Sequence, residues 1–364
     1  MKRAALHITS ICLVISFIFT PNLWAAPAQL KQLPAHVGGR VVVETTAEGD
    51  KAYVYSWPSV YFETAFKGNA LTLKFDDDQN YFQLIVDNGE PIIIKKPGKG
   101  DYQLQNLQQG KHTVRLEKIT ETQNNTGRFL GFYTPEKSKA RALPKRKYSI
   151  EFIGDSFTVG YGNTSPSREC TTEEVFATTN SQLSFGPLTA KEFNADYQVN
   201  ASSGFGVVRN YNGTSPGKSL LKLYPYTLHT PTAIYNAKWQ PQVIVIGLGT
   251  NDFSTPLNAN EPWKTRADLQ KDYVAHYVEF VKSLQQKNPK AHFILMASDQ
   301  TEGEISSQVG RVVATLKTDG IQKVDSILFN SLDYKGCHWH PSAKDDKWLS
   351  GLLISYLKNN KIWK

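Results

Sequence analysis

The pattern of hydrophobic and polar positions changes its period once along the chain. Between about residues 40 and 133, apolar or aromatic residues alternate with polar ones in short runs, at residues 41–44, 53–57, 61–66, 71–75, 82–86, 92–94, 113–116 and 129–132. Turn-forming groups such as Asp87-Asn88-Gly89 separate these runs, and no helical stretch of useful length interrupts them. We therefore predict an antiparallel, jelly-roll-like β-sandwich over residues 29–136.

A basic segment that contains Pro144, residues 137–147, is expected to be a linker. After it, apolar runs at residues 149–153, 197–201, 243–248, 292–297 and 326–330 alternate with stretches at 267–287, 304–317 and 343–359 whose apolar positions recur at helical spacing. This alternation predicts a three-layer α/β/α domain over residues 148–364, with a mostly parallel sheet of about five strands. In such folds the active site lies at the carboxyl ends of the strands.

The first 28 residues have the pattern of a secretory signal peptide. Lys2 and Arg3 precede an apolar run of about a dozen residues, and small residues follow at Ala25, Ala26 and Ala28. The run is shorter than the roughly 20 residues that span a membrane. We expect cleavage after Ala25 or Ala28, no membrane anchor after cleavage, and a secreted or periplasmic protein.

Composition limits the possible partners. The chain has 364 residues, of which 40% are hydrophobic and 20% charged, so it is expected to be globular rather than disordered. Its net charge of +8 is spread along the chain without a long basic block, so no nucleic-acid partner is expected. Nothing in the sequence specifies an oligomeric state.

The cysteine count permits one disulfide. Cleavage of the signal peptide removes Cys12 and leaves Cys170 and Cys337. An even number of cysteines in an oxidising compartment is compatible with one bridge, while two buried free thiols are the alternative.

A candidate nucleophile follows the first strand of the second domain, in the segment Gly154-Asp155-Ser156. A serine at the end of a buried strand presents its hydroxyl at the edge of the sheet. Hydroxyls are poor nucleophiles at neutral pH and need a neighbouring base. By itself, the tripeptide is weak evidence for a nucleophile, and the alternative is a strand-end turn with a helix cap.

Two further strand ends contain groups that could bind an oxyanion. Gly204 follows the second strand, and glycine allows a backbone N–H to approach a substrate oxygen closely. Asn251 follows the third strand and could donate its side-chain amide to the same oxygen. The alternatives are an ordinary glycine turn and a local turn former.

A candidate base lies in the segment His338-Trp339-His340-Pro341, just before the last predicted helix. Pro341 limits flexibility after His340, so the imidazole can be held for proton transfer. A metal site formed by His338 and His340 is the alternative, but zinc needs three or four ligands and no Cys/His cluster elsewhere completes the set. No metal or cofactor is therefore expected.

These four segments, in this order and each after a strand, resemble the four blocks of the SGNH (GDSL) hydrolase superfamily. The resemblance implies that Ser156 is the nucleophile and, through its N–H, the first oxyanion donor. It also implies that Gly204 and Asn251 are the other two donors and that His340 is the base.

A closer resemblance is to carbohydrate esterase family 2, the acetyl xylan esterase group that joins an N-terminal β-sandwich to an SGNH domain. It depends on residues 154–156 with 161–162, and on residues 203–211, 249–253 and 336–341. The resemblance implies a serine esterase that removes acetyl groups from xylan, mannan or glucan units, including acetyl at the 6-hydroxyl of hexopyranoses. Its partner would be an acetylated polysaccharide or oligosaccharide.

The chain departs from the superfamily pattern beside the base. The superfamily usually has an aspartate three residues before the catalytic histidine, where this chain has Cys337, and related esterases have it two before, where this chain has His338. We therefore expect a dyad of Ser156 and His340, with a backbone carbonyl orienting the ring. Asp333 is a possible substitute acid, although a surface turn is the commoner role for such an aspartate.

Other residues near these blocks have secondary roles. Trp339 could stack on a sugar ring, and the alternative is packing at the rim or in the core. Cys170 and Cys337 each neighbour a catalytic block, so we predict that a disulfide joins them and tethers the His340 loop.

Two alternative functions remain open. One is an SGNH esterase or lipase that acts on lipid, peptidoglycan or small acyl esters, because this framework hosts all of these. The other is a non-catalytic carbohydrate-binding protein.

Overall fold

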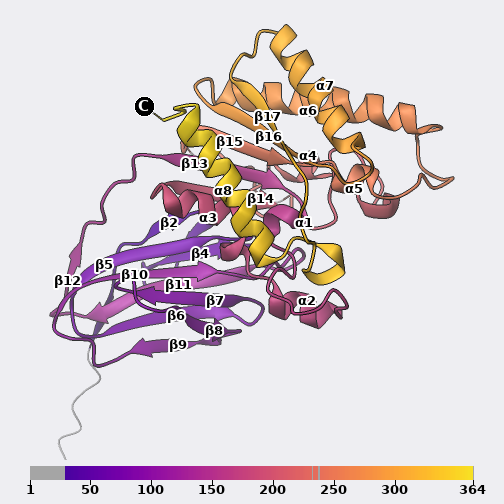
Figure 1. Cartoon of the computed structure of the whole chain (residues 1–364). Helices are drawn as coiled ribbons and strands as arrows, with labels where there is room; N and C mark the ends of the chain where they lie inside the picture. The colour runs from indigo at the N-terminus through magenta and orange to yellow at the C-terminus, as the bar shows by residue number, and fades with distance from the viewer. Residues whose placement is uncertain (1–28, 232, 237, 364) are drawn as a thin grey trace, which may run out of the picture.

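The structure, a computed structural model, describes residues 29–231, 233–236 and 238–363 (Figure 1). The predicted signal peptide, residues 1–28, lies outside the described residues. The described chain forms a β-sandwich followed by an α/β unit, and the two units lie side by side. This confirms the predicted fold class.

The sandwich consists of two antiparallel sheets, each of six strands. One sheet has the order β3-β4-β11-β6-β9 with β1 paired to β11, and the other has the order β12-β5-β10-β7-β8 with β2 paired to β5. The strand bounds are β1 (Leu30–Gln32), β2 (His36–Gly38), β3 (Val42–Thr45), β4 (Lys51–Tyr55), β5 (Tyr61–Gly68), β6 (Leu71–Asp77), β7 (Tyr81–Val86), β8 (Ile92–Lys95), β9 (Gly98–Leu104), β10 (Gly110–Lys118), β11 (Gly127–Pro135) and β12 (Lys139–Arg141).

Four of these strands, β1, β2, β9 and β12, were not expected from the alternation of residues. Three of them have only three residues, and β9 (GKGDYQL) is mostly polar with two glycines, so none has an apolar period to detect. Strand β12 lies within the expected linker, where it pairs with the edge of β5. That part of residues 137–147 therefore belongs to the sheet.

Aromatic side chains fill the space between the two sheets. Phe129 lies at the centre of this cluster, with its ring centroid 4.7 Å from that of Phe62, 4.9 Å from Phe132 and 5.4 Å from Phe75. All four side chains are buried. Large rings that alternate with polar residues along the strands thus explain why this half of the chain closes as a sandwich.

The α/β unit is built on a parallel sheet of five strands in the order β14-β13-β15-β16-β17. Its strands are β13 (Ser149–Gly154), β14 (Asp196–Ala201), β15 (Val243–Gly247), β16 (His292–Ser298) and β17 (Val324–Phe329), and its longer helices are α3 (Phe185–Glu192), α6 (Arg266–Lys287), α7 (Glu304–Thr318) and α8 (Ala343–Asn359). Short helices α1 (Ser156–Val159), α2 (Thr172–Thr178), α4 (Leu220–Leu223) and α5 (Thr250–Phe253) lie in the connecting loops.

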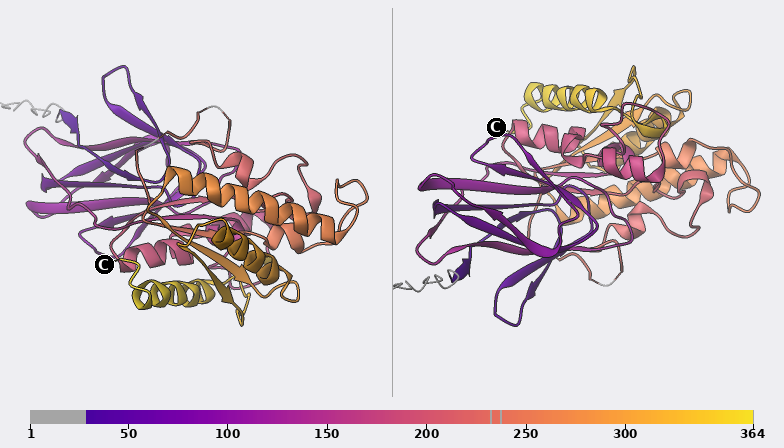
Figure 2. Two further views of the ribbon diagram at one scale, coloured as in Figure 1. Left: turned by 90° about the horizontal axis from the view of Figure 1, so that it is seen from above. Right: turned by 90° about the horizontal axis from the view of Figure 1, so that it is seen from below.

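Helices cover both faces of this sheet (Figures 1 and 2). Along β15, Ile244 and Ile246 pack with the apolar side chains of α6 and α7, while Val243 and Val245 pack with those of α3 and α8. A strand buried on both faces explains the continuous apolar run in its sequence. Helices α6 and α8 begin at capping boxes whose N-cap residues are Thr265 and Ser342.

The sandwich and the α/β unit share a buried polar interface. Arg40 Nη2 of the sandwich lies 3.2 Å from Glu151 Oε1 on β13. The ring centroids of Tyr224 and Tyr235 each lie 4.2 Å from Arg40 Cζ.

Within the residues that the structure describes, no helix has both the length and the apolar character needed to cross a membrane.

Candidate active site

A cavity of about 710 Å³ lies at the carboxyl ends of β13, β14 and β15. Residues that follow each of these strands line it, together with residues of the loop before α8, residues of α2 and three residues of a loop of the sandwich. These residues include Ser156, Gly204, Asn251, Trp339, His340, Glu121 and Gln123. The structure therefore brings together the four segments that the sequence indicated, along with the sandwich loop and α2, which it did not.

Ser156 and His340 are in direct contact in this cavity. His340 Nε2 lies 2.8 Å from Ser156 Oγ, although 184 residues separate them in the chain. His340 Nδ1 faces two carbonyl oxygens, Cys337 O at 2.9 Å and His338 O at 3.2 Å. Because carbonyl oxygens only accept hydrogen bonds, the ring proton resides on Nδ1 and Nε2 is free to accept the serine proton.

The environment of His340 keeps its imidazole neutral. Burial lowers its pKa to about 4, because a protonated, charged ring at this position would not be hydrated by water. The carbonyl oxygens of Cys337 and His338 oppose this shift but do not cancel it. The ring is therefore in the basic form needed for proton abstraction over most of the pH range.

Asp333 is not placed to orient His340. Its Oδ1 accepts hydrogen bonds from Ser342 Oγ at 3.0 Å and from the Lys335 N–H at 3.2 Å, at the turn that leads into α8. The geometry disfavours the alternative of a substitute acid at this position, since this carboxylate stabilises the turn. Main-chain carbonyls take the orienting position instead.

Two aromatic side chains hold the imidazole from its sides. The Tyr161 ring centroid lies 4.3 Å from that of His340, and the Phe157 ring meets it edge-on at 5.6 Å. Both residues follow the candidate nucleophile, on and just after α1. The loop that contains Ser156 thus also restricts the rotation of the base.

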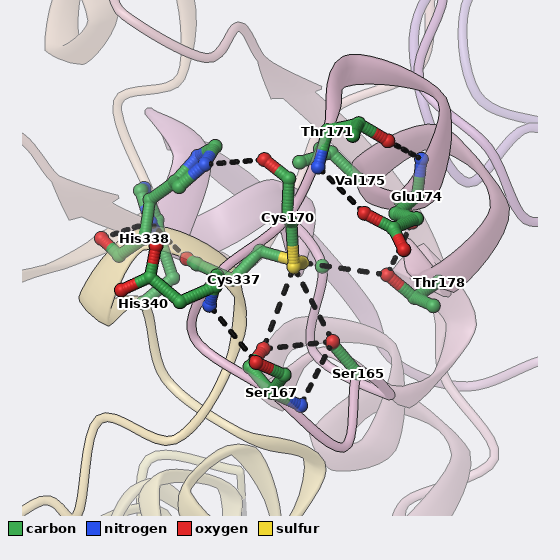
Figure 3. Close-up of a disulfide and its surroundings, with 12 residues drawn as sticks. Ser165, Ser167, Cys170, Thr171, Glu174, Val175, Thr178, Cys337, His338 and His340 are labelled. Carbon is green, nitrogen blue, oxygen red and sulfur yellow. Dashed lines mark hydrogen bonds between the residues drawn. A yellow bond between two sulfur atoms is a disulfide. The ribbon is translucent and has the colours of Figure 1, made fainter.

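A disulfide joins Cys170 to Cys337, as Figure 3 shows. It connects the loop that follows α1 to the loop that contains His340. Gly162 lies against Cys337 so closely that a Cβ added there would fall 2.4 Å from the cysteine Cβ, so only glycine fits at this position. His338 bridges the same two loops, from Tyr161 Oη at 3.1 Å to Cys170 O at 2.8 Å.

These contacts disfavour the alternative of a histidine metal site. Both ring nitrogens of His338, like both of His340, face protein groups at hydrogen-bonding distance. Among the described residues, no group of three or more His, Cys, Asp or Glu side chains is arranged to hold a metal ion.

Trp339 lies at the rim of the cavity with 61% of its surface exposed. The Arg168 guanidinium lies 3.8 Å from the centre of its ring and also donates to Asp333 O and Tyr334 O, both at 2.7 Å. Trp339 and His338 have φ values of 61° and 51°, a left-handed conformation that costs free energy for residues other than glycine. The disulfide and Arg168 hold this strained turn in place.

The residues predicted to donate to an oxyanion, Gly204 and Asn251, line the same cavity as Ser156. Among the described residues, no group accepts a hydrogen bond from the backbone N–H of Ser156 or of Gly204. Gly204 has a left-handed φ of 83°, and no atom lies within 4 Å of where its Cβ would be. Asn251 Nδ2 lines the cavity and donates to Phe205 O at 2.9 Å and to Asp155 Oδ2 at 3.3 Å.

Two buried carboxyl groups support these donors. Asp155 caps α1 by accepting from the Phe157 N–H at 3.0 Å, and burial raises its pKa to about 7. Burial also raises the pKa of Asp252 to about 6, although this carboxyl group accepts from three successive N–H groups, at residues 207–209. Asp252 thereby fixes the loop that follows Gly204.

No sequence pattern predicted that the sandwich loop over residues 119–126 would reach the site. Glu121 and Gln123 in this loop line the cavity and bond to Ser203, beside Gly204. About 80 residues separate the two segments, and the loop has the polar composition of any turn between strands. Only the packing of the two units brings it to the site.

Comparison with protein-family models gives two adjacent matches. Residues 37–144 match the model described as "Carbohydrate esterase 2 N-terminal", and residues 150–351 match the model described as "GDSL-like Lipase/Acylhydrolase".

Two solved structures and one curated protein are similar along nearly the whole chain. A Cellvibrio japonicus protein named acetylxylan esterase / glucomannan deacetylase is 65% identical over 353 residues, covering 96% of this chain and 98% of that protein. A carbohydrate esterase described as having an active site with divergent catalytic and non-catalytic binding functions is 66% identical, with a TM-score of 0.89 over 92% of this chain and 100% of that one. A family two carbohydrate esterase from Clostridium thermocellum, in complex with cellohexaose, is 29% identical, with a TM-score of 0.76 over 91% of this chain and 100% of that one.

Proposed function

The chain belongs to carbohydrate esterase family 2, and from that premise we propose that it removes O-acetyl groups from plant-type polysaccharides with Ser156 as nucleophile and His340 as base. It is a carboxylic ester hydrolase that acts on acetyl esters of carbohydrate, as the resemblance in its sequence implied. The proposal of the two catalytic residues depends on the distance of 2.8 Å between His340 Nε2 and Ser156 Oγ.

The first half of the reaction forms an acetyl-enzyme. His340 Nε2 removes the proton from Ser156 Oγ as this oxygen attacks the acetyl carbonyl carbon. The carbonyl oxygen becomes an oxyanion, which accepts hydrogen bonds from the N–H groups of Ser156 and Gly204 and from the Asn251 amide. The bond between the acetyl carbon and the sugar oxygen then breaks, and His340 returns its proton to the sugar oxygen.

The second half releases acetate. Water loses a proton to His340 Nε2 and attacks the acetyl carbon, which passes through a second oxyanion held by the same donors. The bond to Ser156 Oγ breaks, and this oxygen recovers the proton from His340. While the ring is charged, its Nδ1–H remains bonded to Cys337 O and His338 O, which stabilises the imidazolium.

Asn251 would contribute by exchanging one of its present bonds. Its longer bond, 3.3 Å to Asp155 Oδ2, is the weaker of the two and is the one that an oxyanion would replace. Loss of this bond is tolerable because the buried Asp155 carboxyl group has a pKa raised to about 7 and keeps its bond to the Phe157 N–H.

The rim of the cavity suits a sugar. Trp339 offers an exposed ring whose back is covered by Arg168, and Tyr211 lines the same cavity with 53% of its surface exposed. Exposed aromatic rings beside a polar cavity stack on the apolar faces of pyranose rings. We propose acetylated xylan, mannan or glucan units as substrates, including acetyl at the 6-hydroxyl of hexopyranoses, and acetate release from polymers with defined acetyl positions tests this.

We also infer export from the cell. The basic and apolar pattern of residues 1–28 supports it, and so does the disulfide, because such bonds persist mainly in oxidising compartments. Mass spectrometry of the protein recovered outside the cytoplasm should find a first residue after Ala25 or Ala28. Recovery of the intact N-terminus would contradict export.

The central experiment measures acetate release from acetylated xylan, glucomannan and cellulose by wild type and Ser156→Ala. We expect a loss of turnover of roughly a thousandfold or more, with an unchanged circular dichroism spectrum. Ser355→Ala is the matched control, because this exposed serine on α8 bonds only to the Gly351 carbonyl. Retained turnover in Ser156→Ala would contradict the proposal.

The same assay separates the alternatives. A higher kcat/KM on long-chain than on acetyl aryl esters would indicate a lipase-like enzyme. Binding of polysaccharide without acetate release, and without labelling of Ser156 by a fluorophosphonate, would indicate a binding protein.

A further inference from the structure

A loop of the sandwich forms hydrogen bonds with every polar group of Ser203, the residue before Gly204. Glu121 Oε1 accepts from the Ser203 N–H at 2.8 Å, and Glu121 Oε2 accepts from Ser203 Oγ at 2.5 Å. Gln123 Nε2 donates to Ser203 O at 2.7 Å. The turn that contains Gly204 is therefore fixed from outside the α/β unit, by residues of the loop over 119–126.

The bond to the Ser203 carbonyl acts on the Gly204 N–H directly. These two groups belong to one peptide unit, which is planar and trans, so the C=O and the N–H point in opposite directions. Fixing the direction of Ser203 O therefore fixes the direction of the Gly204 N–H. A hydrogen bond donated to the carbonyl also polarises the unit and strengthens its N–H as a donor.

Gln123 is itself held on both sides. Its Nε2 also donates to Glu121 Oε1 at 3.1 Å, and its main-chain carbonyl accepts from His229 Nδ1 at 3.1 Å. The His229 ring packs edge-on against Trp57 with the centroids 4.2 Å apart. Burial lowers the pKa of His229 to about 3, so the ring stays neutral and this anchor persists across the working pH range.

We propose that Gln123, supported by Glu121, is a positioning residue of the catalytic site that orients the Gly204 N–H toward the oxyanion. The β-sandwich thus takes part in catalysis through its loop over 119–126. The inference rests on the proposed function of Gly204 as an oxyanion donor. Because an oxyanion binds a well-directed N–H more strongly than the ground-state carbonyl does, the effect belongs to the transition state.

The test compares Gln123→Met with wild type, since methionine keeps the length of the side chain but cannot donate. We expect kcat on an aryl acetate to fall about tenfold to a hundredfold while KM stays within about threefold. The rate of Ser156 modification by a fluorophosphonate, which forms a tetrahedral adduct, should fall in parallel. Asn125→Ala is the matched control, because this exposed residue of the same loop contacts Gln79 and not Ser203.

A second variant guards against misfolding of the first. Glu121→Gln keeps the loop and Gln123 but replaces an acceptor of Ser203 with an amide. It should lower kcat in the same direction by several-fold, again with little change in KM.

Two results would overturn the inference. An increase in KM with unchanged kcat would make Gln123 a substrate contact, and unchanged kcat in both variants would leave the loop without a catalytic role. Either result is distinguishable from failure of the proposed function, in which Ser156→Ala itself would keep its turnover.

Discussion

His340 is oriented by two main-chain carbonyls, and a carbonyl has no net charge. An aspartate in this position would stabilise the imidazolium and raise the pKa of the ring, whereas Cys337 O and His338 O leave burial as the larger effect. As the proposed base, His340 is therefore weaker than the histidine of a triad, but it stays unprotonated in more acidic solution. Much of the rate enhancement then depends on the oxyanion donors.

The pH dependence of the reaction should reflect this environment. The pKa of His340, lowered from 6.5 to about 4, implies that the basic form persists down to about pH 4 and that activity is lost as the pH falls through this value. We expect the acid limb of kcat/KM for an aryl acetate to have an apparent pKa near 4. An acid limb near pH 6.5 would contradict this account.

A substitution at Asp333 distinguishes the carbonyl-oriented dyad from a triad. Asp333→Ala removes one acceptor of Ser342 Oγ but no partner of His340, so kcat/KM should remain within about threefold of wild type. Stability should fall by about 1 to 3 kcal/mol, because the bonds from Ser342 Oγ and from the Lys335 N–H are both lost. A loss of kcat/KM of a thousandfold would restore Asp333 as the orienting acid.

At the scale of elements, two loops far apart in the sequence behave as one piece. The loop after α1 and the loop before α8 are joined by the Cys170–Cys337 disulfide, by Arg168 and by His338. Their joint task is to hold the strained turn at residues 338 and 339, and with it the carbonyls that orient His340. Stability and activity should therefore depend on the same bond.

Removal of the disulfide tests this dependence. In Cys170→Ser/Cys337→Ser, 167 residues are released from a closed loop, which should cost about 2 to 4 kcal/mol of unfolding free energy. We expect a lower Tm together with a fall in kcat of at least tenfold, as the His340 loop loses its tether. Thermal unfolding and aryl acetate hydrolysis measure the two effects. Full activity below the Tm would show that the loops hold their position without the bond.

The regular elements of the α/β unit were predictable because their apolar positions repeat. Strand β13 and helix α6 were expected at residues 149–153 and 267–287, and the structure has them at Ser149–Gly154 and Arg266–Lys287. The short helices α1 and α5 were not expected, since four residues are too few to show a helical period. Both follow strand ends and contain proposed site residues.

Periodic hydrophobic patterns do not predict contacts between loops. Gln123 and Ser203 are 80 residues apart, and neither has a neighbour in sequence that suggests the other. The absence of an aspartate at position 337 or 338 did predict that a carbonyl orients His340. It did not show which carbonyl, because that depends on the φ values of a turn that few residues adopt.

At the scale of the whole molecule, a buried cluster of charges joins the sandwich to the α/β unit. The Arg115 guanidinium on β10 lies 2.6 Å from Glu63 Oε1 and 2.5 Å from Glu117 Oε1, both in the sandwich. It also donates to the hydroxyl of Tyr197 on β14 at 2.9 Å. Burial of charged groups is tolerated only where each has a partner. The two units are therefore expected to unfold together.

Calorimetry of Arg115→Met examines this coupling. The substitution removes one partner of two buried carboxylates, while Glu63 keeps Arg146 and Glu117 keeps Lys191. The free energy of unfolding should therefore fall by about 1.5 to 3 kcal/mol, the range for lost hydrogen bonds to charged groups. We expect wild type and variant each to unfold in a single transition. Two separate transitions, with only the sandwich destabilised, would contradict the coupling. Lys111→Met on the same strand is the control, since this side chain is exposed.

The loop over residues 119–126 bears on how this protein can be engineered. Its Glu121 and Gln123 form part of the wall of the cavity that contains Ser156, so we expect that the sandwich cannot be removed or exchanged for a carbohydrate-binding domain without loss of activity. A truncated hydrolase beginning near residue 148 would lose this wall along with the restraint on Ser203. Chimeras intended to redirect the enzyme to new polymers should therefore add modules outside the pair and leave the native junction intact.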